Sequence, residues 1–174
     1  MGSTSSSPRT KEKRTNHANK ISLDVLDNIK KSICKIIYEK NDEKTSGTGF
    51  FMKVNDIKCI ITNYHIISAE LINATINIII YNKNNMNLQL KDRFYKFFER
   101  LDITIVEIKD SDGIMDDILF LEHDLNYQRG YEQYKNIDIL CLQYPKDSIE
   151  VASGKIIEII NNFEFKHDID TDYG

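Results

Sequence analysis

One histidine and one aspartate in this chain stand where acid and base chemistry could take place. His65 follows the apolar run at 57–62, and Asp102 comes directly before the apolar run at 103–108. A histidine can take the proton of a weak nucleophile such as a serine hydroxyl when a carboxylate fixes its tautomer. A carboxylate at the start of an apolar strand is costly without a partner. We therefore predict that His65 is a general base and that Asp102 orients it from within hydrogen-bonding distance.

Each residue taken alone also has a purely structural interpretation. A single histidine is often a satisfied core or surface residue, and a single aspartate is often a charge at a strand edge. The flanking sequence favours the chemical interpretation, because Gly47 and Gly49 open a strand, Thr62 stands three residues before His65, and Asp102 follows in the correct order.

Segments 46–51 and 59–67 resemble the first-barrel signature of the trypsin-like, chymotrypsin-fold serine peptidases, in which a hairpin ends in a Thr-x-x-His turn. Segment 101–106 is similar to that family's Asp-x-Ala-apolar strand, with Thr104 in place of the usual alanine. The resemblance implies an all-β fold of two β-barrels, peptide-bond hydrolysis, and a peptide or protein as substrate.

Two later stretches resemble one branch of that family. Residues 142–145 and 153–156 are similar to the Gly-Tyr-Pro and Ser-Gly-Lys-Ile stretches that begin the second barrel in the glutamyl-endopeptidase-like branch. Gln143 stands where glycine is common. This branch is therefore the one that the sequence favours.

The nucleophile that the resemblance requires is missing from the chain. That branch places its serine after a His-x-x-x-Thr-x-x-Gly stretch, which His167, Thr171 and Gly174 match, so the serine is expected two positions beyond Gly174. The resemblance gives Gly174 an oxyanion-hole N–H and places Asp170 at the base of the S1 pocket, where it would favour Lys or Arg at P1. Alternatively, Asp170 belongs to a solvated acidic run at 168–172.

Neither Ser153 nor Cys141 is expected to replace that serine. Ser153 lacks the leading glycine of a nucleophile turn and stands in the middle of an apparent strand. Cys141 lies in a buried strand pattern, and apolar burial raises the pKa of a thiol. Two hypotheses follow. The chain is the N-terminal part of a trypsin-like serine endopeptidase, inactive by itself, or it is a non-catalytic β-barrel interaction module descended from one.

The elements that would position these residues are mostly short strands. Asn55 and Asp56 tolerate positive φ and predict a two-residue hairpin turn, whereas the asparagine-rich segment 82–87 predicts a loop. Many short strands without alternating helices indicate a sandwich or a barrel. Apolar or alternating runs predict strands at 33–38, 48–54, 57–62, 75–81, 103–108, 118–121, 137–142 and 153–160.

A helix and a tail are expected before the strands. Apolar residues at helical spacing begin at Ile21, with Ser22 as N-cap and further members at Val25, Leu26 and Ile29. The preceding residues are polar and basic and are predicted to be disordered. The predicted organisation is a tail at 1–20, a helix at 21–32, a first barrel at 33–112 and a partial second barrel at 113–174.

Composition excludes several other classes of protein. The chain has 174 residues, a net charge of −4 and no apolar run near the roughly 18 residues of a membrane span. It shows no signal peptide and only three cysteines, without C-x-x-C pairs, which favours an intracellular, cytoplasmic protein. We expect no metal and no cofactor, since His123 has no partner histidine at ligand spacing.

Two segments suggest further partners. Gly2 lies in an M-G-x-x-x-[ST] pattern for N-myristoylation and the basic tail could add an electrostatic signal, so peripheral membrane association is one possibility, and a serine-rich leader is the other. Segment 93–100 mixes basic and aromatic residues, but its place just before Asp102 favours a strand or a packed connection. With the net negative charge, we expect no binding to nucleic acid.

Overall fold

The computed structural model describes residues 21–40, 43–81, 85–161 and 164–171. The tail at 1–20 lies outside these residues. The helix and the strands are α1 (Leu23–Ile29), β1 (Ile33–Lys40), β2 (Glu43–Val54), β3 (Ile57–Thr62), β4 (Thr75–Ile80), β5 (Met86–Gln89), β6 (Tyr95–Phe98), β7 (Ile103–Glu107), β8 (Asp138–Gln143), β9 (Glu150–Ile159) and β10 (Phe165–His167). Short 3-10 helices lie between them: η1 (Lys30–Ser32), η2 (Ala69–Leu71), η3 (Glu99–Leu101), η4 (Asp110–Asp112), η5 (Met115–Asp117), η6 (Leu125–Arg129) and η7 (Tyr131–Tyr134).

The short helix α1 begins where the sequence predicts. Ser22 caps it, and the Ser22 hydroxyl oxygen accepts a hydrogen bond of 3.3 Å from the backbone N–H of Val25. The predicted apolar face is not buried, since Ile21 and Val25 are exposed and the helix has no buried residue. None of the described helices is long and apolar enough to cross a membrane.

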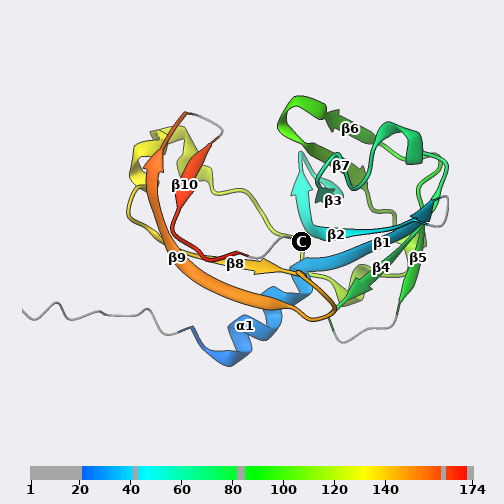
Figure 1. The fold of residues 1–174 in the computed structure, drawn as a ribbon, viewed down its shortest axis with the longest axis horizontal. Coiled ribbons are helices and arrows are strands. Elements are labelled where there is room, and N and C mark those ends of the chain that lie inside the picture. Colours follow the sequence, from blue (N-terminus) through cyan, green and yellow to red (C-terminus); the bar gives the residue numbers. More distant parts are fainter. Residues whose placement is uncertain (1–20, 41–42, 82–84, 162–163, 172–174) are drawn as a thin grey trace, which may run out of the picture.

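Two antiparallel sheets make up the fold (Figure 1). The first is a curled sheet of seven strands in the order β5-β4-β1-β2-β3-β7-β6. Its centre is the β2–β3 hairpin, in which Val54 pairs with Ile57 and the turn residues Asn55 and Asp56 have φ values of 47° and 64°. The predicted hairpin is confirmed, because both turn residues adopt the left-handed backbone that Asn and Asp tolerate.

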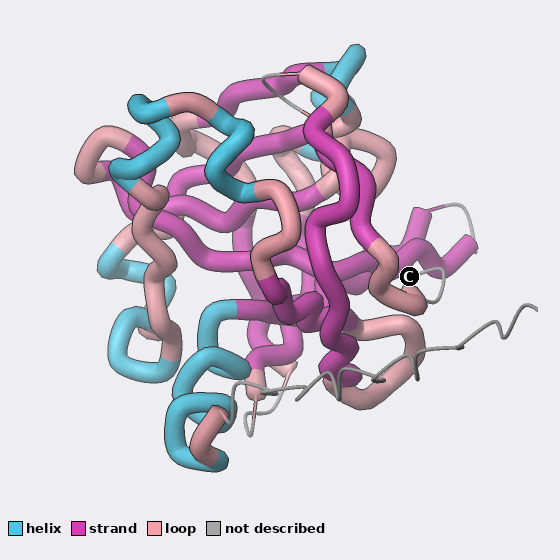
Figure 2. Tube along the Cα trace, turned by 90° about the vertical axis from the view of Figure 1, so that its left-hand side faces the viewer, coloured by secondary structure: helices cyan, strands magenta, loops and turns pink. Residues whose placement is uncertain are grey.

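The second sheet holds β8, β9 and β10 in the order β10-β9-β8 and lies beside the first (Figures 1 and 2). Among the described residues, hydrogen bonds of Tyr144 and Lys35 join the first sheet to the segment after β8. The backbone N–H of Tyr144 donates to the hydroxyl of Thr48 at 2.9 Å. The buried Lys35 donates from Nζ to the carbonyl of Lys146 at 2.6 Å and to Asp147 at 2.9 Å.

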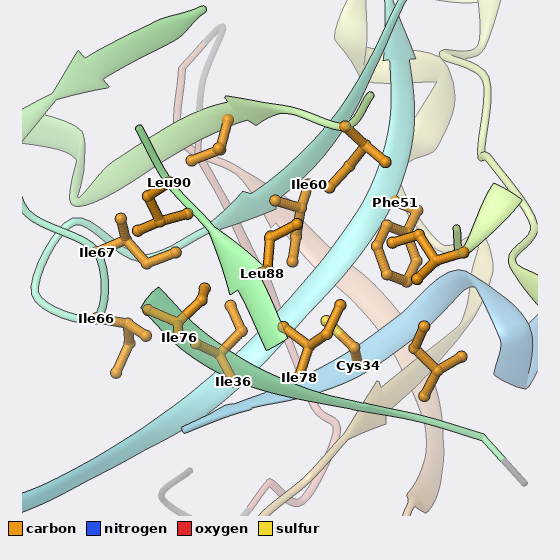
Figure 3. Close-up of a cluster of buried hydrophobic side chains, with 14 of the residues drawn as sticks. Cys34, Ile36, Phe51, Ile60, Ile66, Ile67, Ile76, Ile78, Leu88 and Leu90 are labelled. Atoms are coloured by element: carbon orange, nitrogen blue, oxygen red, sulfur yellow. The ribbon is translucent and has the colours of Figure 1, made fainter. Parts of the chain in front are cut away.

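The hydrophobic core lies inside the curl of the first sheet, where inward side chains of neighbouring strands meet (Figure 3). Alternation along the strands explains it, since Ile76, Ile78 and Ile80 of β4 are all buried. Ile66 and Ile67 complete the core from the turn after β3. The turn after β3 is therefore anchored in the hydrophobic core by Ile66 and Ile67.

Two of the predicted elements are wrong. Segment 118–121 forms no regular strand, and it contacts β2 through a parallel bridge between Leu121 and Met52 and through the ring of Phe120, which packs against Phe51. The predicted loop at 82–87 ends early, because Met86 and Asn87 belong to β5, where they pair with β4. The polar side chains on the exposed face of this edge strand make its pattern of alternating apolar residues hard to recognise in the sequence.

Candidate active site

His65 is carried on a tight turn directly after β3. The Asn63 carbonyl accepts hydrogen bonds of 3.1 Å from the backbone N–H groups of both Ile66 and Ile67, which closes the turn. Both isoleucine side chains are buried in the core. These two side chains hold the turn in place, and the next helical element, η2, begins at Ala69.

Gly47 of β2 leaves room for that anchor. A methyl group at this position would lie 2.6 Å from side-chain carbons of Ile66. The turn is also fixed at its start, since the buried Thr62 donates from Oγ1 to the carbonyl of Thr48 at 2.9 Å. The glycine and the threonine of the sequence signature thus have a physical role in supporting the His65 turn.

Asp102 reaches His65 because β3 and β7 are paired neighbours. Thr62 lies opposite Thr104, which brings the residue before β7 beside the turn after β3. Asp102 follows η3 with φ 53° and ψ 43°, the left-handed backbone that aspartate tolerates. Its carbonyl accepts a hydrogen bond of 3.1 Å from the backbone N–H of Tyr64, which locks the two segments together.

The carboxylate of Asp102 holds His65 at two points. Oδ2 lies 2.7 Å from Nδ1 of the His65 ring, and Oδ1 accepts the backbone N–H of His65 at 2.9 Å. Asn63 donates from Nδ2 to Oδ2 at 3.1 Å. Because the carboxylate occupies Nδ1, the other ring nitrogen, Nε2, is left to face a substrate or a nucleophile.

The side chains of His65 and Asp102 are both exposed to solvent. Their exposed fractions are 63% and 44%, respectively. Burial raises the pKa of Asp102, but the hydrogen bonds from the backbone and ring of His65 outweigh it and hold that pKa below its ordinary value. Asp102 is therefore the ionised partner that a protonated His65 requires.

Thr104 of β7 stabilises the His65 turn through a hydrogen bond. Its buried hydroxyl donates to the carbonyl of Ile67 at 2.7 Å. The alanine that the family signature usually has at this place could not make that bond. The departure from the signature therefore adds a contact between β7 and the His65 turn.

Ser153 and Cys141, which the sequence does not favour as nucleophiles, both lie in the second sheet. Ser153 is an exposed residue within β9, opposite Leu140. Cys141 lies in β8 opposite Ala152, and burial raises the pKa of its thiol. Among the described residues, no serine, threonine or cysteine side chain is hydrogen-bonded to the ring of His65.

The remaining predicted site residues lie away from this pair or outside the described chain. Asp170 is exposed in the segment after β10, and its role in an S1 pocket stays a prediction. Gly174 and Gly2 both lie outside the described residues. Across the part of the chain that the structure describes, no three His, Cys, Asp or Glu side chains are grouped as metal ligands.

Sequence reasoning missed Asn63. Its side chain donates to Asp102 and its carbonyl closes the His65 turn. A signal was present, because a short amide residue directly after a strand and two residues before the candidate base is suited to local hydrogen bonding.

Comparisons with known proteins show the fold. No family model matches the chain, and no curated protein matches it. A serine endoprotease from Yersinia pestis is similar in structure, with a TM-score of 0.59 and 12% identity over 88% of this chain and 51% of that one. Catalytically inactive tobacco etch virus protease complexed with substrate gives a TM-score of 0.51 and 16% identity over 82% of this chain and 62% of that one.

The chain thus spans about half the length of the Yersinia pestis protein that it matches. At these identities the likeness shows the architecture alone. The curled seven-stranded sheet, the second sheet and the two solved proteases agree on an all-β, chymotrypsin-like fold, in which the His65 turn and Asp102 belong to the first sheet.

Proposed function

We propose that this chain supplies the general base and the orienting acid of a trypsin-like serine endopeptidase of the glutamyl-endopeptidase-like branch. The observation that carries the proposal is the two-point hold of Asp102 on His65, at Nδ1 and at the backbone N–H. A surface ion pair does not need both contacts, whereas a base that must keep one ring orientation through a reaction does.

The chemistry follows from the orientation of the ring. With Nδ1–H donated to Asp102, the lone pair of Nε2 takes the serine proton while the serine oxygen bonds to the scissile carbonyl carbon. Asp102 stabilises the resulting imidazolium. His65 then gives the proton to the leaving amine as the C–N bond breaks, and a water molecule repeats the sequence on the acyl-enzyme.

The nucleophile is proposed to be a serine that follows the match at His167, Thr171 and Gly174. Two observations support this proposal. Ser153 lies within β9 and is paired in the second sheet, and the thiol of Cys141 is less acidic than usual because it is partly buried. A peptide or protein is the proposed substrate, and one of the proteases that the chain is similar to, that of tobacco etch virus, was solved complexed with substrate.

The test uses the protein translated from its complete natural reading frame. We expect covalent labelling of one serine by a fluorophosphonate probe and turnover of a peptide library. His65→Ala should abolish both, and Asp102→Asn should lower turnover by about four orders of magnitude. Asp56→Asn is the matched control, because Asp56 is also exposed and left-handed but lies in the β2–β3 turn.

The 174-residue chain alone should not turn over peptides, because no hydroxyl among the described residues is hydrogen-bonded to the ring of its base. Turnover by this chain that His65→Ala removes would make Ser153 or Cys141 the nucleophile and would contradict the proposal.

A non-catalytic peptide-binding module is the second candidate. It is favoured by the lack of any described nucleophile bonded to His65. A protein from the complete frame that binds peptides, resists the probe and keeps its binding in His65→Ala would establish that function and overturn the first.

A further inference from the structure

A second site lies in the other sheet, away from the His65 turn. A cavity of about 360 Å³ opens between the 3-10 helices η6 and η7 and the ends of β9 and β10. In Figure 1 these helices form the yellow segment beside the ends of β9 and β10. The residues that line it are His123, Asp124, Tyr127, Tyr131, Tyr134, Ile156, Ile159, Asn161, Glu164 and Phe165.

Aromatic rings make up much of the wall, and they are tilted to one another. The rings of His123 and Tyr127 lie 5.9 Å apart at 64°, and those of Tyr131 and Tyr134 lie 6.5 Å apart at 48°. In the edge-to-face pair of His123 and Tyr127 one ring presents its edge to a face of the other, so the pair does not cover the remaining ring faces. Tyr127 and Phe165 are 41% and 49% exposed, so their rings are within reach of a ligand.

Two carboxylates are held among these rings. Asp124 accepts the hydroxyl of Tyr134 at 2.9 Å and the backbone N–H of Asn126 at 2.8 Å. The Asn126 N–H and the Tyr134 hydroxyl hold the pKa of Asp124 below its ordinary value. Glu164 accepts an amide N–H of Asn161 at 3.0 Å. Among the described residues that line the cavity there is no lysine or arginine, although the positive charge of Arg129 acts on Asp124 and also lowers its pKa.

We propose that this cavity binds an alkylated ammonium cation. The positive charge attracts the electron-rich ring faces and the two carboxylates, while alkyl groups on the nitrogen fill an apolar space that a hydrated ion would not enter. The volume is that of a small-molecule site rather than a packing defect. The proposal goes beyond peptide hydrolysis and does not depend on it.

The carboxylates also predict which cations bind. A cation that carries an adjacent phosphate would bring a negative charge against Asp124 and Glu164. A free cation, or one on a neutral carrier, is therefore favoured over the headgroup of a choline lipid.

The experiment is a titration of the 174-residue chain followed by NMR of the tyrosine ring protons. The probes are choline, its neutral isostere 3,3-dimethylbutan-1-ol, and phosphocholine. We expect choline to shift the resonances of Tyr127 and Tyr131 and to bind about tenfold more tightly than the neutral alcohol. Phosphocholine should bind less tightly than choline.

Two variants place the binding in the cavity. Tyr127→Leu keeps an apolar side chain but removes a ring face, and it should remove most of the advantage of choline over the alcohol. Asp124→Asn should lower the affinity for choline and leave the affinity for the neutral alcohol unchanged. Phe94→Leu, at a 47% exposed aromatic residue directly before β6, is the control and should bind choline as the parent chain does.

Equal affinity for choline and the neutral alcohol would overturn the proposal, and so would unchanged choline binding in a folded Tyr127→Leu chain. Circular dichroism establishes that each variant is folded. None of these outcomes depends on protease activity.

Discussion

Thr104 donates a 2.7 Å hydrogen bond from its buried hydroxyl to the carbonyl of Ile67, two residues after His65. This bond joins the strand that follows the acid to the turn that carries the base. It makes the distance between His65 and Asp102 a property of the core rather than of two surface loops. The stability of the site can therefore be tested away from the two reacting groups.

Thr104→Val should loosen the His65 turn. The substitution keeps the shape but leaves the Ile67 carbonyl without its donor, which costs about 1–3 kcal/mol of unfolding free energy. Hydrogen exchange at the Ile66 and Ile67 amides should become faster, and Thr104→Ser, which keeps the hydroxyl, should protect them better. Urea denaturation and exchange measured by NMR check both statements. A Thr104→Val chain with native stability and protection would show that the bond does not support the turn.

The buried ion pair between Arg93, just before β6, and Asp112 of η4 should be sensitive to substitution. Its two N–O distances are 2.6 and 2.7 Å, and the side chains are only 4% and 8% exposed. Asp112→Asn leaves a buried guanidinium without its counter-ion, and we expect a loss of about 3–5 kcal/mol.

Asp110→Asn, two residues away, is the matched control. Asp110 pairs with Lys58 at the surface and is 90% exposed, so its loss should cost under about 1 kcal/mol. Urea midpoints of the two variants give the comparison. Equal effects would mean that burial does not distinguish these pairs.

The cysteines should differ in reactivity. Burial raises the pKa of Cys59 to about 11 and raises that of Cys34 as well, and both side chains are fully buried. Cys141 is partly exposed, although burial raises its pKa too. At pH 8 iodoacetamide should therefore modify Cys141 first, because thiolate content and access both limit the reaction. Mass spectrometry of the native chain over time reads the order, and early modification of Cys59 would contradict it.

The sequence predicts local features better than contacts between distant segments. Ser22 and the Asn55-Asp56 turn are set by their own residues, so both are confirmed. The strand β5 was missed because asparagines surround it and only Leu88 is fully buried. The contact of Leu121 with β2 arises from tertiary packing that periodicity does not encode.

The candidate site follows the same division. The positions of His65 and Asp102 could be inferred from motifs, and the structure brings them together. The left-handed backbone of Asp102 and the bond from Thr104 depend on the pairing of β3 with β7, which residue types alone do not fix. The solvent exposure of His65 and Asp102 could not be predicted either, because it depends on which other segments of the fold cover the His65 turn.

Acid should weaken the contribution of Asp102 to stability. Its pKa in the folded protein is below the ordinary value of 3.8, so the ionised form favours the folded state. This contribution is complete well above pH 3.8 and is lost as the pH falls through the folded pKa. The difference in urea midpoint between the parent chain and Asp102→Asn should therefore shrink from pH 6 to pH 3, whereas Asp56→Asn should differ little from the parent throughout. A difference that stays constant over this range would show that Asp102 is not stabilised in its ionised form.

The central claim is that Asp102 fixes the ring of His65 with Nδ1–H donated and Nε2 free to accept a proton. Nitrogen-15 NMR of the 174-residue chain, with two-bond correlations from ring nitrogens to ring carbon-bound protons, reads the tautomer of His65 directly at a pH where the ring is neutral. We predict the Nδ1–H tautomer, with a slowly exchanging Nδ1 proton that disappears in Asp102→Asn and persists in Asp56→Asn. A neutral His65 found as the Nε2–H tautomer, or unchanged in Asp102→Asn, would contradict the account.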